Sequence, residues 1–347
     1  MQKKPVITIA LTALLAVAQA SELPDLPLAV SNNAVAAVEL DDGVHIVSAM
    51  GLLAGKTWRD TTSRAWHLAP GSPQWRELAP VPGPAGRLAA SAVGVAGQIY
   101  LFGGYTVAKD HSEVSVPLVH ALDPRDGSYV EQAAMPVPVD DTVALAYRDR
   151  YVYLVSGWHD SGNVNLVQIF DTQNNSWQQA TPWPEAALFG HAGSIAESRM
   201  VICDGVTVQV TREQRQFRAA KRCLLGKIRE DDISRIDWSV IPHHPGPALY
   251  RMASVAAKVD GRAAIIFAGG SPNPYNYDGI GYNGRPSTAS KKVFAWMVGE
   301  QRWRRLPAMP VATMDHRGLI KYGAELLIVG GMRNQQQVSS DVLQIQR

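Results

Sequence analysis

Polar and charged residues recur at one kind of place in this 347-residue chain, directly before short strand-like runs of small apolar residues. They are Asn32 and Asn33, Arg87, Asp140 and Asp141, His191, Arg251, and Asp315 with His316 and Arg317. Carboxylates and imidazoles can transfer protons, and an arginine can hold a carboxylate through two parallel hydrogen bonds. If the strands converge, these side chains form a pocket for a small anionic or polyhydroxylated ligand. The alternative is that they cap strand ends and pair with one another.

An internal repeat sets the spacing of these residues. Six apolar strands each end in a pair of small residues, and an aromatic residue followed by a proline-containing segment comes about 25 residues later. The small pairs are Ala49-Met50, Gly103-Gly104, Ser156-Gly157, Asp204-Gly205, Gly269-Gly270 and Gly330-Gly331. A period of about 50 residues with strand patterning is typical of kelch blades. We therefore predict an all-β, six-bladed kelch β-propeller, with blades at about 34–82, 86–138, 140–184, 189–247, 250–310, and 312–347 together with 22–30.

The sixth repeat ends after its third strand, and the missing piece lies at the other end of the chain. The segment Leu23-Pro-Asp-Leu-Pro27 matches Leu306-Pro-Ala-Met-Pro310, which ends the fifth repeat. We expect the N-terminal segment to supply the outer strand of the last blade, because such closure leaves no open seam between the first and last blades.

Residues 1–20 have the pattern of a secretory signal peptide. Lys3 and Lys4 precede an apolar run, and Ala18-Gln19-Ala20 is a small-x-small cleavage site. The expected mature chain begins near Ser21 and is periplasmic or secreted. The whole chain has 33 basic and 31 acidic residues, and the signal removes two lysines and no acid, which leaves 31 of each. This balance predicts neither nucleic-acid binding nor membrane insertion of the mature chain.

Cys203 and Cys223 are the two cysteines of the chain, and both fall in the fourth repeat. On neighbouring strands at equal distances from a turn they would form a disulfide, as expected in an oxidising compartment. Two free buried thiols are the alternative. The chain has no CxxC motif, phosphate loop or nucleophile elbow, so we expect no metal and no other cofactor.

Two loops offer further candidates. The long loop 271–290 of the fifth repeat carries Tyr275, Tyr282 and Asn283, which provide the flat faces and amide groups that suit a sugar. The segment Trp158-His159-Asp160 contains a possible general base, but adjacent residues in a loop rarely point at the same atom, so a structural role is favoured there.

The chain resembles the periplasmic kelch propellers of the N-acetylneuraminate epimerase, or sialic acid mutarotase, type. The resemblance rests on the segment after the signal peptide, on Phe267-Ala-Gly-Gly270 with its Tyr/Asn loop, and on the C-terminal strands. It implies a cofactor-free enzyme that interconverts sugar anomers. That family's proposed pair is a Glu after the fourth-blade Gly and an Arg nearby. Here Val206 occupies the Glu position, Arg212 lies near the Arg position, and Asp204 or Glu213 would have to replace the acid.

Two hypotheses follow. In the first, the propeller binds an acidic or N-acetylated sugar and acts as a mutarotase, with Asp204 or Glu213 as the proton shuttle. Its ligand contacts are Arg87, Asp141, His191, Arg212, Arg251, Tyr275, Tyr282, Asn283, His316 and Arg317. In the second, a non-catalytic propeller binds a partner protein or glycan through its loops.

Overall fold

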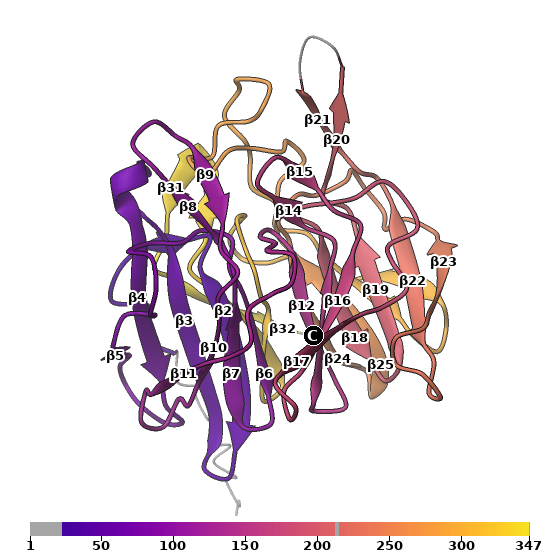
Figure 1. The fold of residues 1–347 in the computed structure, drawn as a ribbon, viewed down its shortest axis with the longest axis horizontal. Coiled ribbons are helices and arrows are strands. Elements are labelled where there is room, and N and C mark those ends of the chain that lie inside the picture. Colours follow the sequence, from indigo (N-terminus) through magenta and orange to yellow (C-terminus); the bar gives the residue numbers. More distant parts are fainter. Residues whose placement is uncertain (1–22, 212–214, 347) are drawn as a thin grey trace, which may run out of the picture.

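The computed structural model describes residues 23–211 and 215–346, and these residues form an all-β structure with two short 3₁₀ helices. Six antiparallel sheets follow one another along the chain (Figure 1). Their inner strands contact one another in a closed ring, in the order β2, β6, β12, β18, β24, β28 and back to β2. The prediction of a six-bladed propeller is confirmed.

Each blade runs from an inner strand to an outer one. The strands are, for blade one, β2 (Ala34–Leu40), β3 (Gly43–Leu53), β4 (Thr61–Leu68) and β5 (Arg76–Leu78), with β1 (Val30–Ser31) beside β3; for blade two, β6 (Ser91–Val95), β7 (Gln98–Phe102), β10 (Val119–Leu122) and β11 (Tyr129–Glu131); for blade three, β12 (Val143–Tyr147), β13 (Tyr151–Val155), β16 (Val167–Asp171) and β17 (Ser176–Gln179); for blade four, β18 (Ala192–Ala196), β19 (Arg199–Cys203), β22 (Cys223–Ile228) and β23 (Ile236–Ile241); for blade five, β24 (Ala253–Val259), β25 (Arg262–Ala268), β26 (Val293–Met297) and β27 (Arg302–Arg305); and for blade six, β28 (Ile320–Tyr322), β29 (Glu325–Val329) and β32 (Val342–Gln346).

Small residues on the inner strands allow six blades to meet at one axis. A Cβ added to Gly94 would lie 2.1 Å from the Ala37 carbonyl oxygen, and one added to Gly318 would lie 2.4 Å from that of Val35. Neighbouring inner strands therefore approach too closely for a larger residue at these positions. They enclose an axial channel of about 360 Å³.

Aromatic residues of the outer strands link each blade to the one before it. The side chains of Trp177 and Trp303 donate hydrogen bonds to the carbonyls of Ala133 and Pro242, and Tyr129 donates to that of Ala79. Each acceptor lies just after the outer strand of the preceding blade. These aromatic residues therefore pack between neighbouring blades.

The same pattern shows how the ring closes. Trp75 of blade one donates to the Pro24 carbonyl, so the N-terminal segment takes the place that ends blade six. The Leu26 amide donates to the Ser340 carbonyl at 2.8 Å, as the Met309 amide does to that of Lys291 in blade five. The two ends of the chain meet as predicted. Residues 23–29 form no strand, however, and residues 1–22 lie outside the described part of the chain.

A second set of strands forms one face of the propeller, which we call the loop face. After the small pair at the end of its second strand, each of four blades continues into a short hairpin (Figure 1). The hairpins are β8–β9 (Tyr105–Val107 and Glu113–Ser115), β14–β15 (Trp158–His159 and Gly162–Asn163), β20–β21 (Val206–Val210 and Arg215–Ala219) and β30–β31 (Met332–Arg333 and Gln337–Val338). Blade five has the long loop 271–290 at this position. No helix within residues 23–211 and 215–346 is long and apolar enough to span a membrane.

Candidate functional site

A cavity of about 260 Å³ opens at the loop face, between the hairpins of blades two, three and four and the long loop of blade five. We call it the loop-face cavity. Its walls are Tyr105, His111, Glu113, Asp140, Asp141, Trp158, Asp160, Phe189, Arg215, Phe217, Arg251, Asn276, Tyr277 and Tyr282. Of the residues predicted to contact a ligand, Asp141, Arg251 and Tyr282 are among them.

An ion-pair network forms the floor of this cavity. Arg251 binds Asp141 through two hydrogen bonds of 3.1 and 2.5 Å, and its third donor group reaches Asp315 at 2.8 Å. Arg317 pairs with Asp141 at 2.6 Å. Burial opposes the charge on Asp141, but the two arginines keep the pKa of its carboxyl below the usual range. Arg251 and Arg317 are therefore committed to aspartates, and pairing among the predicted residues prevails over direct carboxylate binding.

Two carboxyl groups, those of Glu113 and Asp140, lie in the wall of the cavity. Glu113 and Ser115 lie two residues apart on β9, so their side chains point to the same side. The Ser115 hydroxyl donates to Asp140 at 2.6 Å, which brings Asp140 beside Glu113. Burial raises the pKa of Asp140 well above its usual range, with Asp141 adding to the effect.

Glu113 differs from Asp140 in keeping contact with water. The surrounding walls desolvate its carboxyl and raise its pKa to about 7, although the side chain is exposed toward the cavity. A carboxyl group with this pKa can donate or accept a proton near neutral pH, which is the requirement for general acid–base catalysis.

Aromatic side chains form another part of the wall. Phe217 of the β20–β21 hairpin stacks on Tyr282 with ring centres 4.1 Å apart, and Trp158 and Phe189 pack edge to face behind them. The Arg215 guanidinium lies 6.0 Å from the centre of the Trp158 ring. Flat rings beside carboxyl groups suit a ligand with both apolar faces and hydroxyls.

Most of the other predicted ligand contacts lie elsewhere. Arg87 donates to the carbonyls of Gly103 and Pro82 between blades. Tyr275 is buried below the cavity, with its hydroxyl 3.4 Å from Asp315. Asn283 pairs with the amide of Asn273. These side chains hold backbone and loop in place, so the prediction that they contact a ligand has no support from the geometry. Arg212 and Glu213 lie outside the described residues.

His191 and His316, which the sequence predicted as ligand contacts, line the axial channel. Burial lowers the pKa of His191 to about 4 and that of His316 to about 3. Both rings are therefore neutral at pH 7. His191 bonds to the Val155 carbonyl at 2.8 Å, and neither ring lines the loop-face cavity.

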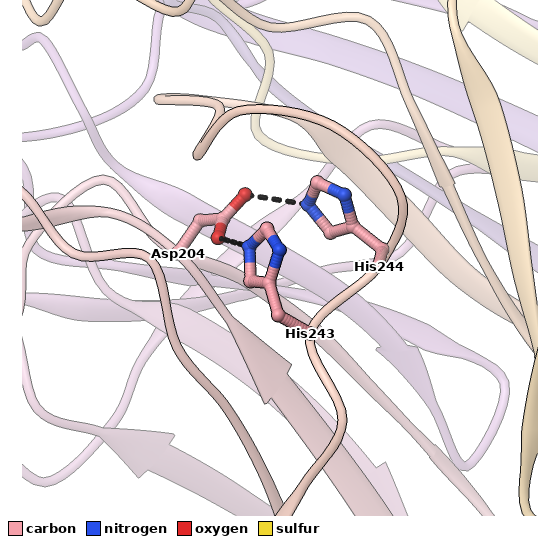
Figure 2. Close-up of side chains that lie close together, drawn as sticks. All are labelled: Asp204, His243 and His244. Carbon is pink, nitrogen blue, oxygen red and sulfur yellow. Dashed lines mark hydrogen bonds and ion pairs between the residues drawn. The ribbon is translucent and has the colours of Figure 1, made fainter.

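Asp204, the other predicted acid, is sealed between blades four and five. Its carboxylate accepts hydrogen bonds from His243 at 2.6 Å, from His244 at 2.7 Å and from the Leu249 amide at 2.7 Å (Figure 2). The side chain is fully buried and lines neither cavity. This position leaves the prediction of proton transfer by Asp204 without support, because no ligand in the loop-face cavity would reach it.

Blade three has an equivalent hydrogen bond to the backbone, without the histidines. Ser156 occupies the place of Asp204, at the first residue of the small pair, and its hydroxyl accepts the Leu188 amide at 2.8 Å. Leu188 and Leu249 both precede the inner strand of the next blade. Asp204 therefore anchors the connection between blades four and five, and the two histidines satisfy the remaining carboxylate lone pairs.

Asp204, His243 and His244 are also the one group of three within residues 23–211 and 215–346 whose ligand atoms, all within 4.8 Å, could hold a metal ion. An ion bound to both Nε2 atoms would leave the ring protons on Nδ1. The Nδ1 atoms of both histidines are buried and have no hydrogen-bond partner in the described part of the chain. The hydrogen-bonded arrangement therefore fits these residues better than a metal centre does.

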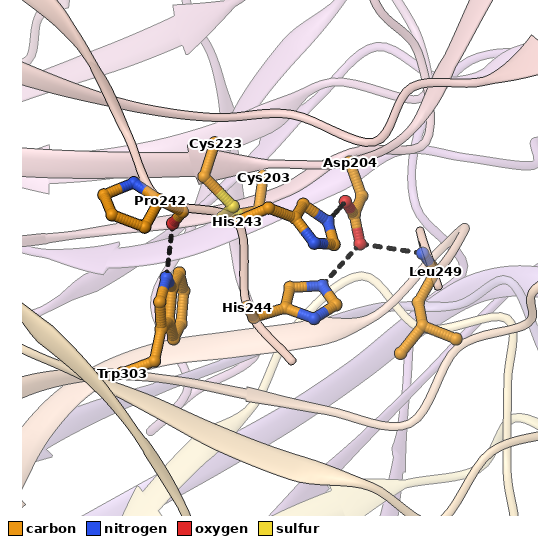
Figure 3. The surroundings of a disulfide bond; sticks show 8 residues. All are labelled: Cys203, Asp204, Cys223, Pro242, His243, His244, Leu249 and Trp303. Carbon is orange, nitrogen blue, oxygen red and sulfur yellow. Dashed lines mark hydrogen bonds and ion pairs between the residues drawn. A yellow bond between two sulfur atoms is a disulfide. The ribbon is translucent and has the colours of Figure 1, made fainter. Parts of the chain in front are cut away.

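Cys203 and Cys223 form a disulfide beside this group (Figure 3). They are direct cross-strand partners on β19 and β22, with Cα atoms 4.2 Å apart. This resolves the choice that the sequence left open in favour of the bond.

Comparisons with known proteins agree with this architecture. No protein-family model matches the chain. Kelch-like protein 15 of Homo sapiens is 26% identical over 116 residues, or 33% of this chain, and that of Gallus gallus is 27% identical over 116 residues. The solved structure of YjhT superposes with a TM-score of 0.71 at 16% identity, covering 94% of this chain and 97% of that one. The chain has the fold of a six-bladed kelch β-propeller.

The matched part of the kelch propeller spans 19% of the length of human Kelch-like protein 15 and 23% of the chicken protein. The likeness to YjhT concerns the fold.

Sequence reasoning missed Glu113, Arg215 and Phe217. They lie on hairpins that follow the small pairs, whereas many of the predicted site residues precede the inner strands. The signal that would have found Glu113 is an acidic residue inside a strand-like run, Glu113-Val-Ser-Val116, shortly after a Gly-Gly pair. Asp140, Trp158 and Asp160 were noted in the sequence, and all three line the cavity.

Proposed function

We propose that this propeller binds a sugar in the loop-face cavity and speeds the interconversion of its anomers. The observation that carries the proposal is the pair of carboxyl groups, Glu113 and Asp140, which line one cavity together with aromatic rings. The resemblance to sialic acid mutarotases supports the same reaction class. The proposed base and acid, Glu113 and Asp140, differ from Asp204 and Glu213, which the sequence predicted as proton shuttles.

The reaction needs two proton transfers. A base removes the proton of the anomeric hydroxyl while an acid protonates the ring oxygen, and the bond between the anomeric carbon and that oxygen breaks. The open chain carries a carbonyl group, and rotation about the adjacent bond turns its other face toward the hydroxyl. The same two protein groups then run the proton transfers in reverse, and the ring closes as the other anomer. Glu113, with a pKa of about 7, can serve as the base, and Asp140, whose pKa is raised well above its usual range by burial, can serve as the acid.

An acidic or N-acetylated sugar fits this site best within the proposal. Arg251 and Arg317 are committed to aspartates, whereas Arg215 lines the cavity beside Trp158 and can bind a carboxylate or an amide oxygen. Phe217 and Tyr282 provide apolar surface for the ring or a methyl group.

Export of the protein belongs to the same proposal. Residues 1–20 have the order of a signal peptide, and the buried Cys203–Cys223 disulfide is the bond expected in the periplasm or outside the cell. A small carbohydrate is the proposed partner.

Exchange NMR tests the activity. N-acetylneuraminate, N-acetylglucosamine and glucose would each be mixed with the wild-type protein and with Glu113→Gln. We expect the catalysed exchange rate of at least one sugar to fall by about 10²–10⁴-fold in the variant. Glu131→Gln, an exposed glutamate on the outer strand of the same blade, is the control and should match the wild type. If no sugar exchanges faster with the protein while one binds, the non-catalytic binding propeller is the correct function.

A further inference from the structure

The β20–β21 hairpin extends farther from the body of the propeller than the other hairpins of the loop face (Figure 1). Its two strands pair Val206 with Ala219, Val208 with Phe217, and Val210 with Arg215. Cross-strand partners share one side of a ribbon, and alternate residues of a strand do too. The three valines therefore form a single row on the side of the hairpin that carries Phe217 and Arg215.

This row begins inside the protein and ends in solvent. Val206 is fully buried, Val208 is half-buried, and Val210 is 76% exposed, more than any other large apolar side chain in the described residues. Phe217, in the middle of the same side, forms part of the wall of the loop-face cavity. The apolar wall of the cavity thus continues upward beyond its mouth.

The opposite side of the hairpin has a different character. Thr207, Gln209, Gln216 and Arg218 point away from the valine row, and Arg218 bonds to Gln216. An apolar side chain at Val210 is not needed to bury the hairpin, because nothing in the described chain covers it. Because Val210 pairs with Arg215, which lines the cavity, a ligand that extends out of the cavity along the hairpin would reach it.

We infer that the valine row with Arg215 is a second subsite, which holds the next residue of an oligosaccharide whose reducing end occupies the loop-face cavity. This inference rests on the proposed function, because it assumes a sugar in the cavity. It adds the substrate class, namely glycans of two or more residues with a free reducing end.

Size and shape favour a glycan over a protein at this subsite. The accessible part of the row, from Val208 to Val210, covers two residue steps, about 7 Å at the rise of a strand, which is about the length of one sugar ring. It is only one side chain wide on each strand, whereas a stable protein interface buries about 800 Å² on each partner. Arg215 lies opposite Val210 at the outer end of the row and also lines the cavity, so its planar group can donate to oxygens of either sugar residue.

Calorimetry on paired sugars tests the subsite. The pairs are glucose with cellobiose, N-acetylglucosamine with N,N′-diacetylchitobiose, and N-acetylneuraminate with its α2,8-linked dimer. In the pair that binds, we expect the disaccharide to bind about tenfold more tightly than the monosaccharide, since it buries additional apolar surface. Val210→Ser should reduce that advantage about fivefold and leave monosaccharide affinity unchanged.

Gln209→Ser is the matched control, because it changes the adjacent exposed residue on the other side of the hairpin. It should bind both sugars as the wild type does, and both variants should keep the wild-type melting temperature. Equal affinity for the two members of a binding pair, or equal effects of the two substitutions, would overturn the subsite and leave the proposed function standing. Self-association that is lost in Val210→Ser would also overturn it. Binding of no sugar at all would contradict the proposed function itself.

Discussion

Glu113 and Asp204 are both acidic residues close to a Gly-containing small pair, yet their surroundings make them opposite kinds of group. Asp204 is completely buried and accepts three N–H groups. Glu113 faces a cavity, and its pKa is raised to about 7. The sequence predicted Asp204, and not Glu113, as a proton shuttle, and the structure places two histidines beside it. The comparison teaches that a reactive group needs unused hydrogen-bonding capacity and access to a ligand, and Asp204 has neither.

The largest expected difference between these two residues is in stability. Asp204→Ala would leave the Leu249 amide and two imidazole N–H groups buried without an acceptor, which should lower the free energy of unfolding by roughly 3–5 kcal/mol. Glu113→Gln should not lower it, because the neutral amide replaces a carboxyl group whose charge is opposed by desolvation. Urea denaturation of both variants measures this, and an Asp204→Ala protein as stable as the wild type would show that the cluster is not a structural brace.

Asp204→Ser sharpens the same comparison. The hydroxyl of Ser156 already accepts the corresponding amide in blade three. A serine at position 204 should therefore recover part of the stability lost with alanine, and the same denaturation series would show it. Equal losses for serine and alanine would mean that the two histidines, and not the Leu249 amide, account for the effect.

The disulfide beside Asp204 gives the next largest effect. It closes a separation of 20 residues, so replacing Cys203 and Cys223 together by alanine should cost about 3 kcal/mol. The exchange rate of sugar anomers at the loop-face cavity should not change at temperatures where the variant is folded. A folded variant with a reduced exchange rate would instead connect this region to the site.

The repeat made the fold predictable, because small pairs and outer-strand aromatic residues mark every blade. The site was harder to predict. Arg251 and Asp141 are 110 residues apart in sequence, and only ring closure brings them together. Glu113, Arg215 and Phe217 lie on hairpins whose approach to one another depends on the spacing of blades two and four around the axis. Residue type identified Asp141, Arg251 and Tyr282, but their partners follow from three-dimensional packing.

The smallest expected effect is the pH dependence of stability that Glu113 causes. Its pKa in the folded protein, about 7, is above its ordinary value of 4.5. The folded state therefore binds this proton more tightly than the unfolded chain does. The resulting stabilisation is present below pH 4.5 and is lost as the pH rises through 7. Relative to Glu113→Gln, the wild type should lose stability over this range in a urea series, and a gain would contradict the raised pKa.

The most direct test of the account is the pH dependence of anomer exchange itself. The rate would be measured by exchange NMR between pH 5 and 9 for the wild type and Glu113→Gln, with sugar binding checked in both. We predict an apparent pKa near 7 in the wild-type profile, and its disappearance in a variant that still binds the sugar. An unchanged profile in Glu113→Gln would show that this carboxyl group does not move the proton.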